Sequence, residues 1–139
     1  MTDRQSPGVS PLGRSDIEMN VPAGGEYLSV LRTAAAGLAA RLNFTLDDIE
    51  DLRIAVDEAC SMLLAQANSG SRLDCRFRLS EDSITFRASV SADSPTLPAK
   101  DGFAWTVLTA LATAVDVRIS EPDVLTIELS RARPAHGFA

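Results

Sequence analysis

Apolar residues recur along the chain with two different spacings. A period of two residues, typical of half-buried strands, occurs in five segments, 17–21, 73–79, 84–90, 115–119 and 125–129. A spacing of three and four residues, typical of one buried helical face, occurs in three others, 26–42, 46–67 and 103–114. Their order predicts an α+β fold: a two-layer α/β sandwich in which three helices lie on one face of a mostly antiparallel five-stranded sheet.

Local signals indicate where these segments begin and end. Pro22 closes the first strand, and turns at 80–82 and 121–123 predict two hairpins. Thr45 resembles the first residue of a capping box in which Asp48 takes the usual place of Glu. These signals predict a long helix that starts directly after Thr45.

The helix predicted at 46–67 has two distinct rows of side chains. The row expected in the core consists of Ile49, Leu52, Val56, Ala59 or Cys60, Leu63 and Ala67. Ile54, Glu58 and Met62 follow one another at intervals of four residues in a different row. Glu58 and Met62 are therefore expected on the same face of the helix.

The length of 139 residues fits one domain. Residues 1–15 are rich in Ser, Pro and Gly without an apolar period, which predicts a disordered N-terminal arm. The same argument predicts a flexible tail at 132–139. The folded domain is expected at 16–131.

Charge and composition exclude several classes of function. A net charge of −6 without a basic run argues against direct binding of nucleic acid. The absence of a long apolar segment and of a signal-like start argues against a membrane location and predicts a cytoplasmic protein. His136 lies alone in the tail, so no metal site is expected, and Cys60 and Cys75 are expected as buried reduced thiols.

Four stretches of the chain resemble one family. They are Pro22 to Arg32, Asp51 to Ala67, Ala88 to Asp93 and Asp101 to Leu111. Together they are similar to the RsbW-type anti-sigma factor and serine-protein kinase family of the histidine-kinase-like ATPase superfamily (GHKL), including its mycobacterial branch with degenerate ATP motifs. The resemblance covers about residues 17 to 130 and implies the same fold with a short lid.

The resemblance assigns roles to individual residues. Glu58 falls at the position of the catalytic general base, Asp93 at that of the adenine-recognising Asp, and Gly102 in the glycine turn that binds phosphate. Arg32 falls where the family contacts both the sigma factor and its antagonist, with Glu26 and Tyr27 as weaker partner-binding candidates. The family's cofactors are ATP and magnesium, and its partners are a sigma factor, a STAS-domain antagonist and a second copy of the chain.

Departures from the family pattern lie in the nucleotide site. Met62 stands where the family has Asn, and a thioether cannot replace the hard oxygen ligand that magnesium requires. Pro95 and Ala104 stand where the family has Gly. Eight residues separate Asp93 from Gly102, enough to reach only about 15 Å out and back as a lid.

These observations favour an anti-sigma factor that sequesters a stress or sporulation-type sigma factor and is released by the STAS-type antagonist. This activity requires no phosphate chemistry. One alternative is an active serine kinase that phosphorylates the antagonist with ATP and magnesium, using Glu58 and Asp93. Another is an adaptor that binds a different regulatory protein without nucleotide.

Overall fold

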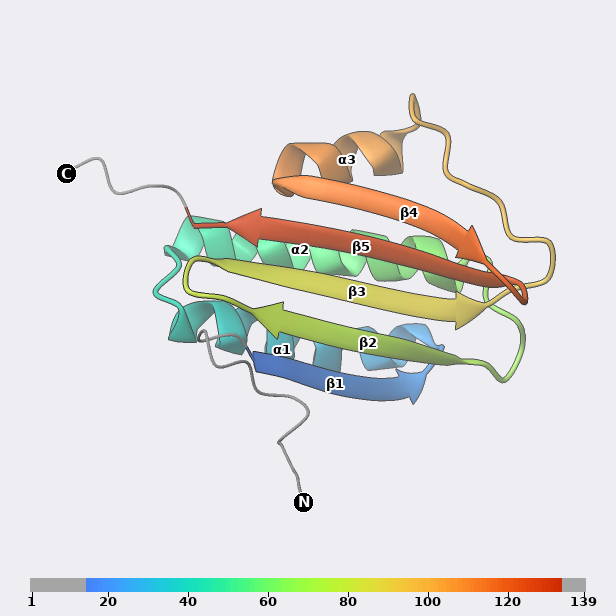
Figure 1. Cartoon of the computed structure of the whole chain (residues 1–139), viewed down its shortest axis with the longest axis horizontal. Helices are drawn as coiled ribbons and strands as arrows, with labels where there is room; N and C mark the ends of the chain where they lie inside the picture. The colour runs from blue at the N-terminus through green and yellow to red at the C-terminus, as the bar shows by residue number, and fades with distance from the viewer. Residues whose placement is uncertain (1–14, 134–139) are drawn as a thin grey trace, which may run out of the picture.

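The computed structural model describes residues 15–133, which form one sheet and one layer of helices (Figure 1). A short 3-10 helix, η1 (Gly25–Tyr27), precedes the first α-helix. The helices are α1 (Leu28–Arg41), α2 (Leu46–Leu64) and α3 (Phe103–Leu111). The strands are β1 (Ser15–Pro22), β2 (Arg72–Leu79), β3 (Ser83–Ser91), β4 (Ala114–Ser120) and β5 (Val124–Ala132).

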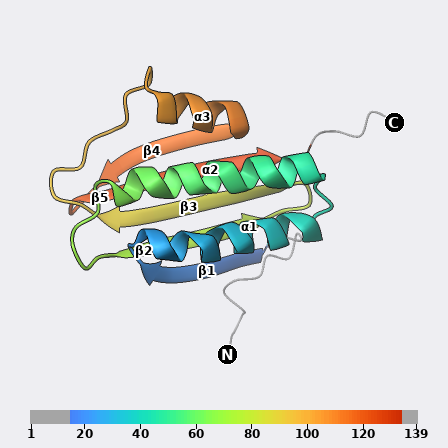
Figure 2. The ribbon, with the colours of Figure 1, turned by 180° about the vertical axis from the view of Figure 1, so that it is seen from behind.

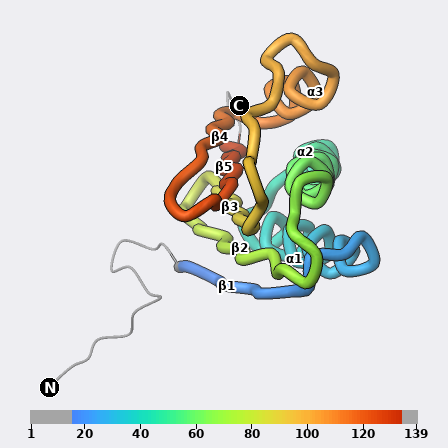
Figure 3. Tube along the Cα trace, turned by 90° about the vertical axis from the view of Figure 1, so that its right-hand side faces the viewer, coloured from blue at the N-terminus to red at the C-terminus, as the bar shows by residue number. Residues whose placement is uncertain are grey.

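The five strands lie in the order β1-β2-β3-β5-β4, and each neighbouring pair is antiparallel. All three α-helices cover the same face of the sheet (Figures 2 and 3). The predicted α+β sandwich is therefore confirmed. Because the helices occupy one face, the other face carries only side chains of the strands among residues 15–133.

The core lies between the helices and the three central strands. Phe77 and Phe86 face one another across β2 and β3, with ring centroids 4.9 Å apart. The helices contribute fully buried leucines to the same hydrophobic cluster, among them Leu31, Leu52 and Leu63. The strict alternation of buried and half-buried residues from Ser83 to Val90 of β3 follows from the period of two in the sequence.

Two helix ends differ from the sequence prediction. The third helix was expected to reach Ala114 but ends at Leu111, because Ala112 is extended and Ala114 already belongs to β4. The apolar spacing predicts Val107, Leu108, Leu111 and Ala112 on the inward side of this helix. Only Leu108 of these is fully buried, since α3 lies at the border of the sheet. The second helix ends at Leu64 rather than Ala67.

The predicted arm and tail lie almost entirely outside the described residues and stay predictions. Strand β1 begins at Ser15 and β5 ends at Ala132, close to the expected borders of the domain. Within residues 15–133, no helix combines the length and the apolar character needed to cross a membrane.

A buried ion pair joins three elements that are distant in sequence. The Nη2 of Arg131 on β5 lies 2.6 Å from Oδ1 of Asp48 and 3.2 Å from Oδ2 of Asp51, both on α2. Its Nη1 donates to the carbonyl oxygen of Leu111 at the end of α3. Asp48 also completes the predicted cap, because its N–H donates to Oγ1 of Thr45 at 3.1 Å. The hydrogen bond from Arg131 holds the pKa of Asp48 below its usual value, against the opposing effect of burial.

We expect Arg131→Met to lower the free energy of unfolding at neutral pH by about 3 kcal/mol, because Asp48 would stay buried without its cation. The lowered pKa of Asp48 means that the pair stabilises the fold above the carboxyl pKa of the unfolded chain. This contribution is lost as the pH falls through the folded pKa. The difference between the two proteins should therefore narrow in acid, which denaturant unfolding at a series of pH values measures.

Arg53→Met provides the matched control. Arg53 pairs with Glu50 at 2.7 Å, but both side chains are about half exposed, and such pairs contribute roughly 0 to 1 kcal/mol. Equal destabilisation by both substitutions would contradict the special role of Arg131.

Candidate functional site

Glu58 and Met62 lie one turn apart on α2, in the row of side chains that begins with Ile54. Helix α2 contacts α1 on one side and α3 on the other. Both Glu58 and Met62 are half-buried, and Met62 packs against the hydrophobic core. The structure thus confirms the shared face, and it shows the Met62 thioether engaged in apolar packing.

Asp93 follows β3 and opens the segment 93–102, which we call the strap. The Asp93 side chain is exposed, and its N–H donates to Oδ1 of Asn68 at 2.8 Å. The side-chain amide of Gln66 binds the backbone of Thr96 in both directions, donating to its oxygen at 3.0 Å and accepting from its N–H at 2.8 Å. The strap is therefore tied to the end of α2 at two points.

Gly102 ends the strap and is the residue that precedes α3. Its N–H donates to the carbonyl oxygen of Ala99 at 2.9 Å, and an added Cβ would lie 3.1 Å from that oxygen. A tight turn therefore explains this glycine without a phosphate. The following residue, Phe103, is 81% exposed.

These residues do not fit the magnesium-triphosphate site that the family resemblance implies. Position 62 offers sulfur in a hydrophobic contact where a hard oxygen ligand is required. Gly102 already uses its N–H within the chain, and the strap is tethered by Gln66 rather than free to fold over a ligand. We therefore derive no catalytic step through magnesium and ATP.

The partner-binding candidates lie at the start of α1. Nη1 of Arg32 contacts Oδ1 of Asp57 on α2 at 2.6 Å, and the two side chains are 36% and 40% exposed. Glu26 is exposed on η1, and Tyr27, half-buried, is the residue before α1. The sequence analysis missed Asp57, because a contact between two helices leaves no signal in the spacing within either one.

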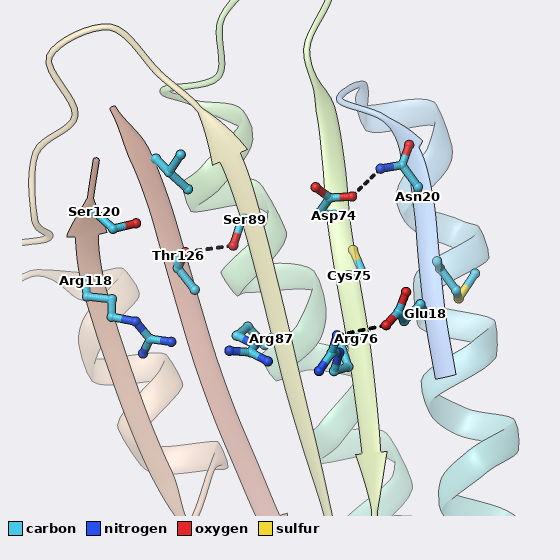
Figure 4. A pocket seen from close by; sticks show the side chains of 12 residues that line it. Glu18, Asn20, Asp74, Cys75, Arg76, Arg87, Ser89, Arg118, Ser120 and Thr126 are labelled. Carbon is cyan, nitrogen blue, oxygen red and sulfur yellow. Dashed lines mark hydrogen bonds and ion pairs between the residues drawn. The ribbon is translucent and has the colours of Figure 1, made fainter. Parts of the chain in front are cut away.

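The face of the sheet without helices carries charged side chains in register. Glu18, Arg76, Arg87, Glu128 and Asp116 lie opposite one another on the five strands in sheet order. A shallow cavity of about 740 Å³ covers this face, and Figure 4 shows the ion pair between Arg76 and Glu18 at 2.8 Å within it. In the sequence, this surface is indicated by the polar residues that alternate with apolar residues along each strand.

Cys60 and Cys75 are both free and buried, as expected. Burial raises the pKa of both thiols, that of Cys75 to about 12. Since the thiolate is the reactive form, neither cysteine is a nucleophile at neutral pH.

We expect Gln66→Ala to increase the rate of amide hydrogen exchange at Thr96 about five- to tenfold, because the N–H of Thr96 loses its acceptor. Gln66→Glu keeps an acceptor and loses only the donor, so Thr96 should stay protected in this control. Unchanged exchange in Gln66→Ala would show that the strap is held by other contacts. Hydrogen exchange followed by NMR resolves this single amide.

No protein-family model matches the chain. Individual proteins do. The chain is 38% identical over 91 residues to serine-protein kinase RsbW of Bacillus cereus (strain G9842). The aligned region covers 62% of this chain and 57% of that protein. The corresponding protein of Bacillus subtilis (strain 168) is 38% identical over 81 residues, 56% of this chain and 51% of that protein.

Anti-sigma-F factor RsbW of Mycobacterium tuberculosis (strain H37Rv) is 35% identical over 96 residues, 69% of this chain and 57% of that protein. The chain thus spans about half the length of the curated relatives it matches. The chain belongs to the RsbW-type family.

Proposed function

We propose that this domain is an anti-sigma factor. It binds a sigma factor of the stress or sporulation type in a stoichiometric complex and is released when a STAS-domain antagonist competes for the same surface. The observation that carries the proposal is the 35% identity, over 96 residues, to a protein named as an anti-sigma-F factor. The proposal places the protein in the cytoplasm, where sigma factors act, and includes a homodimer.

The surface formed by α1 and α2 supports this proposal. Arg32 is held by Asp57 with its guanidinium partly exposed, which fixes the side chain before a partner arrives. Each helix also exposes an aliphatic side chain, Val30 (46%) on α1 and Ile54 (43%) on α2. An arginine on helices that also expose apolar side chains agrees with the composition typical of protein interfaces.

A second candidate function is the serine kinase, because several relatives are named serine-protein kinase. Glu58 is the residue that would act as its base. The packing of Met62 in the core and the tethered strap weigh against this candidate. The adaptor without a sigma factor is the third candidate, and no separate observation favours it.

We expect Arg32→Glu to weaken sigma-factor binding by about 30-fold or more, which corresponds to about 2 kcal/mol, because the substitution reverses the charge at the proposed contact. It also places two carboxylates together, at 32 and at Asp57. Asp57→Ala separates these effects, since it removes the intramolecular partner and keeps the cation. This variant should retain most of the binding.

Calorimetric titration of a sigma factor of this class into each protein measures the affinities. Arg72→Glu on β2 is a control with the same reversal of charge at an exposed position outside the surface formed by α1 and α2. Full affinity in Arg32→Glu would place the contact elsewhere, and an absence of binding by the unmodified chain would remove the anti-sigma proposal.

We expect no phosphoserine in the antagonist when the unmodified chain is incubated with labelled ATP, magnesium and the antagonist. Magnesium should also fail to tighten the binding of ATP, because Met62 supplies no oxygen ligand. Phosphorylation that is abolished by Glu58→Gln would establish the kinase function instead. Phosphorylation that survives Glu58→Gln would indicate a contaminating kinase.

A further inference from the structure

Two arginines lie directly opposite one another at the centre of the sheet face without helices. Arg76 on β2 and Arg87 on β3 are register partners, and both side chains line the cavity on this face. Like charges at opposite positions of an antiparallel pair are destabilising. The arrangement therefore costs stability in the free protein, as local features of functional sites often do.

Only one of the two guanidinium groups is neutralised within the described chain. Arg76 donates to Oε2 of Glu18 at 2.8 Å. No carboxylate of residues 15–133 forms an ion pair with Arg87, and this includes Glu128, its opposite neighbour on β5. Since Arg87 is half-buried and carries five N–H donors, its guanidinium is available to an anion that enters the cavity.

A pair of hydroxyl groups lies next to Arg87 on the same face. Oγ of Ser89, two residues further along β3, lies 2.7 Å from Oγ1 of Thr126 on β5 (Figure 4). Thr126 is only 6% exposed and lines the same cavity. Two hydroxyl groups have two hydrogens, and their mutual bond uses one of them. The pair therefore has one hydrogen left to donate to a bound molecule.

Arg118 on β4 adds a second cation to this place. It is the register partner of Thr126, and Figure 4 shows Arg118 and Arg87 extending toward β5 from the strands on either side of it. Nη1 of Arg118 lies 2.8 Å from Oδ2 of Asp116, but the side chains are 47% and 63% exposed. Solvent screens such a pair, so Arg118 can turn toward a ligand at little cost.

We propose that this cavity binds the phosphate group of a small molecule. Arg87 and Arg118 donate charged hydrogen bonds to the phosphate oxygens, and the hydroxyl pair of Ser89 and Thr126 donates a neutral one. Arginine suits this role because its planar fork matches phosphate geometry. The cavity volume of about 740 Å³ lies in the range of small-molecule sites.

The charges around the site favour a small anion over a large one. Both edge strands carry carboxylates on this face, Asp16 and Glu18 on β1 and Asp116 on β4. An extended polyanion that crossed the face would meet these carboxylates as well as the arginines, on a chain with a net charge of −6. A single phosphate group meets the central arginines alone.

The proposed site is separate from the two surfaces discussed above. Arg32 and Glu58 belong to the helical layer, on the other side of the sheet, and Gly102 directly precedes a helix of that layer (Figure 3). The inference rests on strand residues and needs neither the anti-sigma function nor the family's nucleotide site. Binding of phosphate and of a sigma factor can therefore be measured independently.

NMR titration of the isotope-labelled full chain with inorganic phosphate tests the proposal, at about pH 8, where phosphate is a dianion, and at constant ionic strength. We expect the amide signals of Ser89 and Thr126 to shift on binding. Arg87→Met should weaken binding about tenfold or more, because it removes a charged donor, and Ser89→Ala about threefold. Arg87→Lys keeps the charge without the planar fork and should be intermediate.

Arg41→Met is the matched control. It removes the same charge from an exposed position at the end of α1, in the helical layer, and should bind phosphate like the unmodified chain. Unfolding curves verify that all variants are folded. Equal weakening by Arg41→Met and Arg87→Met would show a general effect of charge and would overturn the proposal.

The position of the shifts and the size of the ligand provide two further tests. Signals that shift at Gly102 instead of Ser89 would place the anion in the helical layer. Binding of a phosphoserine peptide without binding of free phosphate would show a docking surface for a protein. Either result, or an absence of shifts, would overturn the proposal, and none of them involves the sigma factor.

Failure here is therefore distinguishable from failure of the proposed function. Arg87→Met should leave the affinity for the sigma factor unchanged, because Arg87 lies on the face of the sheet opposite to α1 and α2.

Discussion

The ion pair between Arg131 and Asp48 constrains how α2 and α3 lie on the sheet. It fixes the start of α2, the end of α3 and the end of β5 at one buried point. A buried pair contributes little compared with apolar side chains of equal size, but loss of one partner is expensive because the other charge remains buried. The pair is imperfect as well, since Nε of Arg131 has no hydrogen-bond partner within residues 15–133. Its effect is therefore to select one arrangement, in which α3 ends at Leu111 and the chain turns directly into β4.

The sequence was sufficient to predict the order of elements and most of the core. The periods of two residues gave the five strands, because one face of each central strand is buried and the other is not. The predicted end of the third helix was wrong. The apolar pattern continues from Val107 to Ala114, but Arg131, which is distant in sequence, donates to the carbonyl oxygen of Leu111, where the helix ends. Asp48 was recognised as a cap, but its partner lies 83 residues away. Contacts between separate elements, such as Arg32 with Asp57, were invisible for the same reason.

The candidate nucleotide site illustrates how a local tether changes the meaning of a motif. The family resemblance assigns Glu58, Asp93 and Gly102 to the ATP site, yet the backbone N–H groups of Asp93 and Gly102 are hydrogen-bonded within this chain. Gln66 and Asn68 bind the strap through backbone groups, which a side-chain substitution at Asp93 or Thr96 would not remove. A Cβ added at Gly102 would be crowded by the carbonyl oxygen of Ala99. A short connection held at two points has little freedom to order around a ligand, because the entropy of the loop has already been lost on folding.

The proposed sigma-factor surface is built on an exposed ion pair, and this has a physical reason. The side chains of Arg32 and Asp57 are each more than one third exposed, so water and salt screen the pair. Such a pair adds little to the stability of the isolated fold. Either side chain can therefore exchange its partner for a group on another molecule at little cost in free energy. In the free protein the pair keeps both side chains extended. It also adds no net charge to a chain that already carries −6. The buried pair of Arg131 cannot be exchanged in this way, which is why it anchors the fold and the exposed pairs are available for binding.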